Sequence, residues 1–277
     1  MKILVTGATG NVGRMVVDEL VALGADDVRA LTVNPRKAAL PDGVEAVRGF
    51  LGKVETLPAA LAGVDVMYLA PHLPTVAEVC RLAADAGVRK IVDLAGAKGE
   101  HWQRIEDGVE ASGVPFTHLE PGEFMSNADL WAPQIRAGDV VEDAYGDAVN
   151  APIAQEDIAA VAARVLVEDG HDGRAYELTG PQALTRRQKV EAIGRALGRD
   201  LTYVDLPHEE ALPVFERAMG EYASWYLDGL AMLARYPQAA VPTVARLTGR
   251  PAMTYEQWAR RHEAIFRTRF GGHSEVR

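Results

Sequence analysis

The chain has 277 residues, of which 48% are hydrophobic and 25% charged, and its formal net charge is −10. These proportions are typical of a globular protein with a substantial buried core. The acidic charge and the lack of a Lys or Arg cluster make nucleic acid or an anionic membrane an unexpected partner. A single cysteine, Cys80, excludes an intrachain disulfide and a thiolate metal cluster. Since the sequence lacks a signal-peptide pattern and a long apolar run, we expect a cytoplasmic protein.

Short apolar runs alternate with amphipathic segments through the first half of the chain. The helical patterns include residues 13–24 and 75–87, which end in glycine, as many helices do. Strands that are apolar throughout and alternate with helices predict an α/β fold, a doubly wound parallel sheet covered on both faces. The predicted strands are Ile3–Val5, Val28–Val33, Val44–Val47, Val64–Leu69, Ile91–Leu94 and Phe116–Leu119.

The pattern changes after about Asn150. Residues 154–169 and 185–198 have helical periodicity, residues 175–180 and 201–207 resemble strands, and mostly helical segments rich in aromatic residues follow. We therefore predict two parts: residues 1–150, which contain the sheet, and a smaller, mixed but mainly helical lobe, residues 151–277, packed on the first.

The first predicted strand leads directly into a glycine-rich turn, "TGATGNVG", residues 6–13, and a predicted helix follows. Gly7, Gly10 and Gly13 permit a tight turn, a close approach of a pyrophosphate to the backbone, and close packing of helix on strand. The N-terminus of the helix offers free N–H groups to the phosphates. This strand, turn and helix at the start of an α/β chain predict dinucleotide binding.

The turn "VTGATGNVG" resembles that of the extended and atypical short-chain dehydrogenases, and the NmrA-like group in particular. The segments "VDVMYLAP", "ASGVPFTHLEPGEFMSN", "EDIAAVAARVL" and "YELTGPQALT" resemble the same group. The resemblance implies a Rossmann domain over residues 1–150 that binds NAD(P). It implies that the pyrophosphate is lined by Gly7, Thr9, Gly10, Asn11, Val12 and Gly13. It also implies that Leu69, Ala70 and Pro71 border the nicotinamide-side ribose, with Ala95 and Gly96 beneath the ring.

The residues after the second predicted strand bear on the choice between NADP and NAD. An acidic residue there binds the ribose 2′-hydroxyl, whereas a basic residue accepts a 2′-phosphate. Val33 stands where the NmrA-like group usually has Arg, and no acid is present. Arg36 and Lys37 either reach a phosphate or form a solvated first helical turn. The missing carboxylate favours NADP. Phe50 also departs from the group, in which an Asp commonly approaches the adenine.

The standard catalytic residues of short-chain dehydrogenases are absent from the sequence. Those enzymes use a Tyr with a Lys four residues later, and none of the eight tyrosines here has that Lys. Lys98 and His101 lie just past the fifth predicted strand, where ligands bind in open α/β sheets. We name both as candidate catalytic residues, Lys98 as a donor to a developing alkoxide and His101 as an acid near neutral pH. The alternative is that both are solvated surface residues.

A second set of residues is a candidate substrate site. Glu120 precedes Pro121 where the NmrA-like group usually has Arg, so its partner must differ. Polar and aromatic side chains that could line a pocket follow it, and His72 follows the Ala-Pro turn toward the cofactor edge. The candidate substrate residues are His72, Glu123, Phe124, Asn127 and Trp131. Phe124 and Trp131 are equally suited to the core.

These features predict an NAD(P)H-dependent reductase that passes hydride to a quinone or a conjugated or aromatic ketone. A quinone suits a site without a strong proton donor, because hydride addition gives a stabilised anion. The rival interpretation is a non-catalytic NAD(P) sensor that binds a protein partner. Epimerisation or dehydration with bound cofactor is a third. No histidine spacing suggests a metal site, and no G-x-S-x-G motif suggests a serine hydrolase. The expected partner is a small-molecule substrate, and a homodimer is left open.

Overall fold

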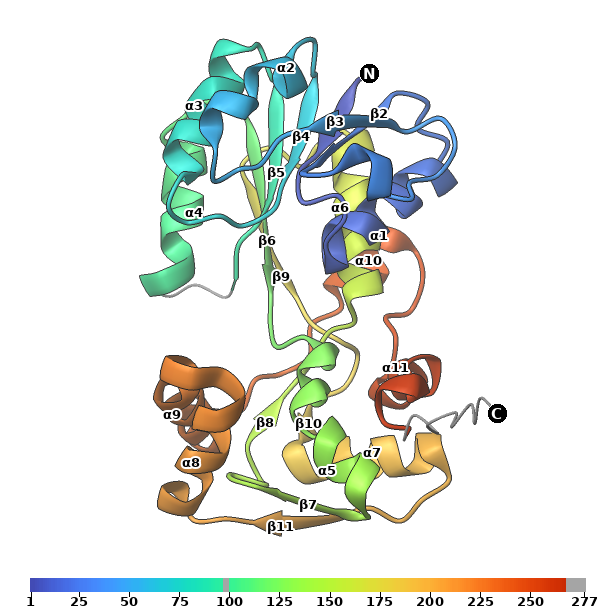
Figure 1. Ribbon diagram of the computed structural model, residues 1–277, viewed down its shortest axis with the longest axis vertical. Helices are drawn as coiled ribbons and strands as arrows, with labels where there is room; N and C mark the ends of the chain where they lie inside the picture. The colour runs from blue at the N-terminus through green and yellow to red at the C-terminus, as the bar shows by residue number, and fades with distance from the viewer. Residues whose placement is uncertain (97–99, 268–277) are drawn as a thin grey trace, which may run out of the picture. The chain divides into compact units, whose positions relative to one another are not determined.

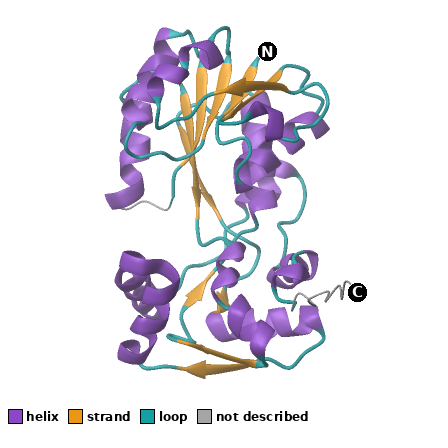
Figure 2. Ribbon diagram, in the orientation of Figure 1, coloured by secondary structure: helices purple, strands orange, loops and turns teal. Residues whose placement is uncertain are grey.

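The computed structural model describes residues 1–96 and 100–267, and its first unit is built on a seven-stranded sheet (Figures 1 and 2). All of the pairings in this sheet are parallel, and the strand order is β3-β2-β1-β4-β5-β6-β9. The strands are β1 Ile3–Val5, β2 Val28–Thr32, β3 Glu45–Arg48, β4 Val66–Leu69, β5 Lys90–Leu94, β6 Phe116–Pro121 and β9 Arg174–Leu178. The predicted doubly wound parallel sheet is confirmed.

Helices cover both faces of the sheet because its central strands are buried along their whole length. One face carries α2, Pro58–Leu61, α3, Val76–Asp85, and α4, Glu100–Glu110. The other carries α1, Asn11–Ala22, and α6, Gln155–Val167, which pack against each other, with α10, Thr243–Thr248, against α6 (Figure 1). Two turns of 3₁₀-helix, Pro35–Lys37 and Val54–Thr56, lie in the loops that follow β2 and β3.

The strand order reverses at β1, which pairs with β2 on one side and with β4 on the other. Ile3 is in register with Val28 and with Val66. In open α/β sheets, ligands bind beyond the carboxyl ends of the strands at such a reversal. The turn that follows β1 therefore occupies the place where a ligand is expected.

The two compact units interleave along the chain, whereas the sequence predicts two parts separated by a single boundary near residue 150. Unit 1 comprises Met1–Gly122, Gln155–Thr179 and Val241–Ala252, and unit 2 comprises Glu123–Ala154, Gly180–Ala240 and Met253–Arg277. The difference arises because β9 pairs with β6 and because α6 packs against α1. Both elements follow residue 150 but complete the sheet and its helical layer.

Unit 2 is mainly helical and has two short two-stranded sheets. Its helices are α5 Ala132–Ala137, α7 Arg186–Leu197, α8 His208–Met219, α9 Ala223–Arg235 and α11 Tyr255–Arg261, with 3₁₀ turns at Met125–Leu130, Gly220–Tyr222 and Glu263–Ile265. Its strands are β7 Val140–Asp143, β8 Val149–Asn150, β10 Leu184–Thr185 and β11 Thr202–Asp205. No helix in the described part of the chain is long and apolar enough to cross a membrane.

Candidate functional site

The glycine-rich turn is partly exposed, and at two of its positions a side chain has no room. Gly7 has a φ of +60°, in the left-handed region, and a Cβ there would lie 2.8 Å from the Cβ of Ala70. A Cβ on Gly13 would overlap the carbonyl group of Gly7, closer than real Cβ atoms approach. Gly10 donates its N–H to the Gly7 carbonyl at 2.8 Å. Glycine is therefore required at positions 7 and 13 for the turn to close over the start of α1.

The first turn of α1 has the properties of an anion-binding site. Gly10 is the N-cap residue, no side chain caps the helix, and its first turn contains no acidic residue. Thr9, Gly10 and Asn11 are exposed, whereas Val12 is buried. An uncapped helix N-terminus combines free N–H groups with a positive dipole end, which together favour a phosphate. The predicted pyrophosphate residues thus lie together, and because Val12 is buried, only its backbone can meet a ligand there.

The residues that follow β2 include several that are exposed. Val33 is 62% exposed, and Arg36 and Lys37 are exposed in the following 3₁₀ turn. Neither basic side chain has an ion pair or hydrogen bond with the described residues. Arg14 of α1 donates to the Ala39 carbonyl at 2.7 Å and so ties this loop to α1. The loop therefore presents two cations that have no ion pair with the described residues.

The ends of β1 and β4 are tied together beside the turn. The Thr6 hydroxyl accepts the Ala70 N–H at 2.8 Å, and the Thr6 N–H donates to the Tyr68 carbonyl at 3.1 Å. Leu69 is buried, Ala70 is half-buried and Pro71 is exposed. Leu69 can therefore meet a ligand only through its backbone.

His72 is held in a defined orientation after β4. The Thr75 hydroxyl donates to the Leu51 carbonyl at 2.8 Å, so it accepts a hydrogen bond from His72 Nδ1, also at 2.8 Å. The Phe50 ring, 44% exposed, meets the His72 ring edge-on with the centroids 5.5 Å apart. In the neutral ring, this arrangement leaves Nε2 of His72 as a hydrogen-bond acceptor.

The segment after β5 lies beneath α4. Ala95 and Gly96 are both buried, and a Cβ on Gly96 would lie 2.6 Å from the Trp102 indole. Lys98 lies outside the described residues. His101 belongs to the first turn of α4, and the structure describes only its backbone. The role of Ala95 and Gly96 beneath the nicotinamide ring therefore stays a prediction, as do the two candidate catalytic residues.

Four of the candidate substrate residues belong to unit 2, and Glu123 among them is part of a buried ionic network. Its carboxylate binds Lys189 Nζ at 2.5 Å, and it accepts hydrogen bonds from Asn150 at 2.6 Å and Tyr226 at 3.2 Å. Burial alone would raise the pKa of Glu123, but Lys189 and Arg186 outweigh it and lower the pKa to about 2. Glu123 is therefore a charged structural anchor.

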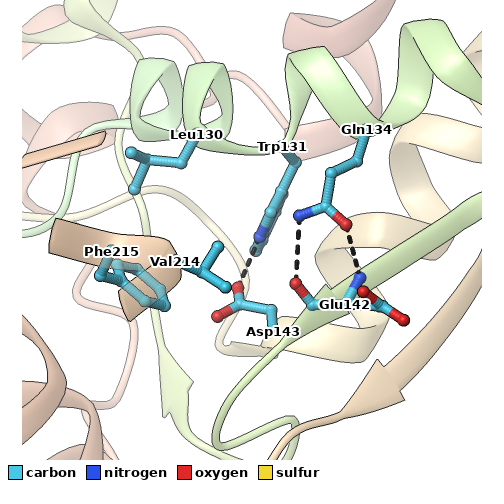
Figure 3. Close-up of a pocket in the computed structure, with 7 residues that line it drawn as sticks. All are labelled: Leu130, Trp131, Gln134, Glu142, Asp143, Val214 and Phe215. Carbon is cyan, nitrogen blue, oxygen red and sulfur yellow. Dashed lines mark hydrogen bonds between the residues drawn. The ribbon is translucent and has the colours of Figure 1, made fainter. Parts of the chain in front are cut away.

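Trp131 continues this network and also borders a small pocket (Figure 3). The indole is buried in a hydrophobic cluster and donates its N–H to Asp143 at 2.5 Å, and Asp143 also pairs with the buried Arg186. Apolar side chains form much of the pocket wall, whose full lining is Leu130, Trp131, Gln134, Glu142, Asp143, Val214 and Phe215. Phe124 and Asn127 do not line it. Sequence reasoning missed Lys189, Arg186 and Asp143, because nothing in local spacing links them to Glu123.

The described residues form no metal-binding site. No group of three or more His, Cys, Asp or Glu side chains there is placed to hold a metal ion.

Comparison with known proteins agrees with this geometry. Residues 7–169 match the NAD(P)H-binding family. The chain is 38% identical to the (4-alkanoyl-5-oxo-2,5-dihydrofuran-3-yl)methyl phosphate reductase of Streptomyces griseus, covering 95% of this chain and 99% of that protein. It is 34% identical to the NAD(P)H azoreductase of Xenophilus azovorans, with the same two coverages. A solved structure, the NADPH-dependent quinone oxidoreductase of Escherichia coli complexed with NADPH, is 26% identical with a TM-score of 0.83, covering 93% and 98% of the two chains.

Proposed function

Because the chain belongs to the NAD(P)H-binding family, we propose that it is a reductase that passes hydride from NADPH to a conjugated acceptor such as a quinone. The observation that supports cofactor binding is the uncapped N-terminus of α1, which follows a turn that requires glycine at positions 7 and 13. The acceptor class is supported by the relatives, whose names specify an azo compound, a quinone and an oxo-dihydrofuran phosphate. All three contain electron-poor conjugated systems.

The described residues fit a dinucleotide at several points. The backbone N–H groups at the start of α1 would hold the pyrophosphate, and the half-buried Ala70 and the exposed Pro71 would border a ribose. Bound NADPH supplies the hydride. The chain's own contribution is to orient the cofactor by fixing β1 to β4 through Thr6 and Ala70. Preorganised contacts of this kind lower the entropic cost of reaching a reactive geometry.

We infer a preference for NADPH over NADH from the end of β2. Arg36 and Lys37 are exposed and uncommitted, and no carboxylate follows β2 to repel a 2′-phosphate. A charge-assisted hydrogen bond to a phosphate contributes roughly 1.5 to 3 kcal/mol. Such a bond from either residue is enough to select NADPH by about tenfold or more.

The proton for the reduced acceptor has three proposed donors. His72 is held by Thr75 just after β4, and only in the protonated ring does its Nε2 carry a proton to donate. Lys98 and His101 follow β5 in the sequence, and both are proposed as donors on that ground alone. A quinone needs little help from such groups, since the hydroquinone anion that hydride transfer produces is stabilised by its own ring.

The test is NADPH and NADH oxidation with a panel of quinones and conjugated ketones, in the wild type and in Arg36→Ala. We expect turnover with NADPH, and in Arg36→Ala a KM for NADPH raised about tenfold with the KM for NADH unchanged. Arg104→Ala, an exposed arginine of α4, is the matched control and is expected to leave both KM values unchanged. Tight NADPH binding with no turnover on any acceptor would favour a sensor over a reductase.

A further inference from the structure

A buried pair of glutamates joins α4 to the sheet and takes no part in the proposed cofactor contacts. Glu106 of α4 is 3% exposed, Glu120 of β6 is 8% exposed, and their side chains hydrogen-bond to each other. Counted as carboxylates, each leaves one buried oxygen without a donor. Two carboxylates accept hydrogen bonds but have none to donate, so the contact requires a proton on one of them. The docked pair therefore holds one proton between its two carboxyl groups.

The other titratable groups around this pair come from α4, β5 and β6. His118 of β6 contacts Asp93 of β5 at 2.6 Å and Glu110 of α4 at 3.4 Å. Asp93 is fully buried, whereas the Glu110 side chain is 54% exposed. Gln103 of α4 donates an amide hydrogen to Glu106 at 3.3 Å. Burial alone would lower the pKa of His118, but the bond to Asp93 raises it, so that pair keeps a proton of its own.

The same helix fixes the backbone that follows β5. Trp102, one turn before Glu106, covers Gly96 so closely that a Cβ there would lie 2.6 Å from the indole. Ile105 and Val109 of α4 are completely buried in the hydrophobic core. Because side chains one turn apart lie on one face of a helix, the seating of Glu106 on Glu120 and of Trp102 on Gly96 is coupled.

We propose that the proton shared by Glu106 and Glu120 acts as a latch that docks α4 on β6 and so positions the Gly96 backbone at the nicotinamide end of the cofactor site. Both glutamates are positioning residues that act through α4 and Trp102. The effect on the cofactor rests on the proposed function. The docking of α4 does not, since it depends only on contacts within unit 1.

The latch has a defined pH dependence. Burial raises the pKa of Glu106 to about 7, with His118 opposing the rise and Glu120 adding to it. The docked state thus binds the proton more tightly than an opened, solvated α4, in which the glutamate has its ordinary pKa of 4.5. Between these two values, each unit by which the pH rises increases the equilibrium constant for opening of α4 by up to about tenfold, and this increase levels off above pH 7.

Hydrogen exchange of the α4 amides at pH 5, 6, 7 and 8, corrected for intrinsic rates, tests the latch directly. We expect the opening equilibrium of the wild type to rise up to about tenfold per pH unit from 5 to 7 and then to flatten. In Glu106→Gln the amide donates to Glu120 at every pH, so the curve should be flat. Asp107→Asn changes an exposed neighbour on the same helix, and it should keep the wild-type curve.

The dissociation constant of NADP⁺, measured on the same samples, tests the positioning role. We expect it to rise about threefold or more from pH 6 to 8 in the wild type and in Asp107→Asn, and to rise less in Glu106→Gln. The cofactor's own phosphate titrates equally in all three. A flat exchange curve in the wild type, or an unchanged slope in Glu106→Gln, overturns the latch. If the exchange depends on pH but the NADP⁺ affinity does not, the positioning role is overturned. If NADP⁺ does not bind at all, the proposed function fails, and the exchange data still decide the latch.

Discussion

At the scale of single residues, the cofactor turn depends on two glycines for different reasons. Gly7 needs its positive φ, whereas Gly13 needs the absence of a Cβ because the Gly7 carbonyl occupies that space. A methyl group on Gly13 must push the turn away from the start of α1. The backbone amides that face a pyrophosphate would move with it.

We therefore predict that Gly13→Ala weakens NADPH binding more than tenfold, as measured by fluorescence titration. Gly229→Ala is the matched control, since its helical site has nothing within 4 Å of the new Cβ and alanine favours a helix over glycine. It should bind NADPH like the wild type. Equal affinity in Gly13→Ala would show that the turn does not hold the pyrophosphate.

The sequence predicts this turn well because its constraints are local, with strand, glycines and helix lying within about 20 residues. It could not predict the roles of Glu123 and Trp131 for the opposite reason. Glu123 meets Lys189, 66 residues away in the sequence, and Trp131 donates to an Asp143 that α7 also binds through Arg186. From the sequence, Glu123 is a candidate pocket residue, and Trp131 suits a pocket wall as well as a core.

At the scale of elements, α7 anchors unit 2 by placing two buried cations next to the buried Asp143 and the half-buried Glu123. Arg186 pairs with Asp143, and Lys189 pairs with Glu123. The helix begins with a capping box at Thr185 and Gln188, which fixes the turn that carries both cations. Removing one partner leaves the other charge buried and unpaired, which costs more than the pair contributes.

We predict that Lys189→Met lowers the free energy of unfolding by about 3 to 5 kcal/mol at pH 7, measured with urea. Arg195→Met, an exposed residue of the same helix paired with Glu256, should cost at most about 1 kcal/mol. Glu123→Gln combined with Lys189→Met should recover part of the loss, because no charge is then left unpaired. An equal loss in the double variant would mean that the pair is not the cause.

The same variant has a pH signature. In the wild type the pKa of Glu123 is lowered to about 2 from 4.5, so its stabilisation is complete above pH 4.5 and is lost as the pH falls toward 2. In Lys189→Met the buried carboxyl becomes easier to protonate. The gap in unfolding free energy between wild type and Lys189→Met should therefore narrow between pH 5 and pH 3.

At the scale of the whole molecule, the family, the parallel sheet and the reductase class were all predictable from the sequence, whereas the composition of the two units was not. Apolar residues in the local sequence indicate each of the first six strands, although β3 is itself mostly exposed. β9 is mostly exposed, and only its pairing with β6 assigns it to the sheet. Long-range pairing of this kind leaves no local signal.

This arrangement predicts that a fragment of residues 1–150 does not fold cooperatively and does not bind NADPH. It lacks α6, whose Ile158, Val161 and Val165 are completely buried, and it leaves β6 as an unpaired edge. Circular dichroism during urea titration and NADPH fluorescence would measure both properties against the full chain. A fragment with a sharp transition and unchanged affinity would support a boundary near residue 150 instead.

The interleaving of the units also sets an order of events during synthesis of the chain. The glycine-rich turn and six strands of the sheet leave the ribosome first. β9 begins at Arg174, 53 residues after β6 ends at Pro121, and α10 begins only at Thr243. At roughly 5 to 20 residues per second, the nascent sheet waits several seconds for its seventh strand. During that time the edge of β6 and the α6-binding side of α1 are bare. Nascent chains of this protein therefore expose the edge of β6 and the α6-binding side of α1 to chaperones until β9 and α6 have been synthesised.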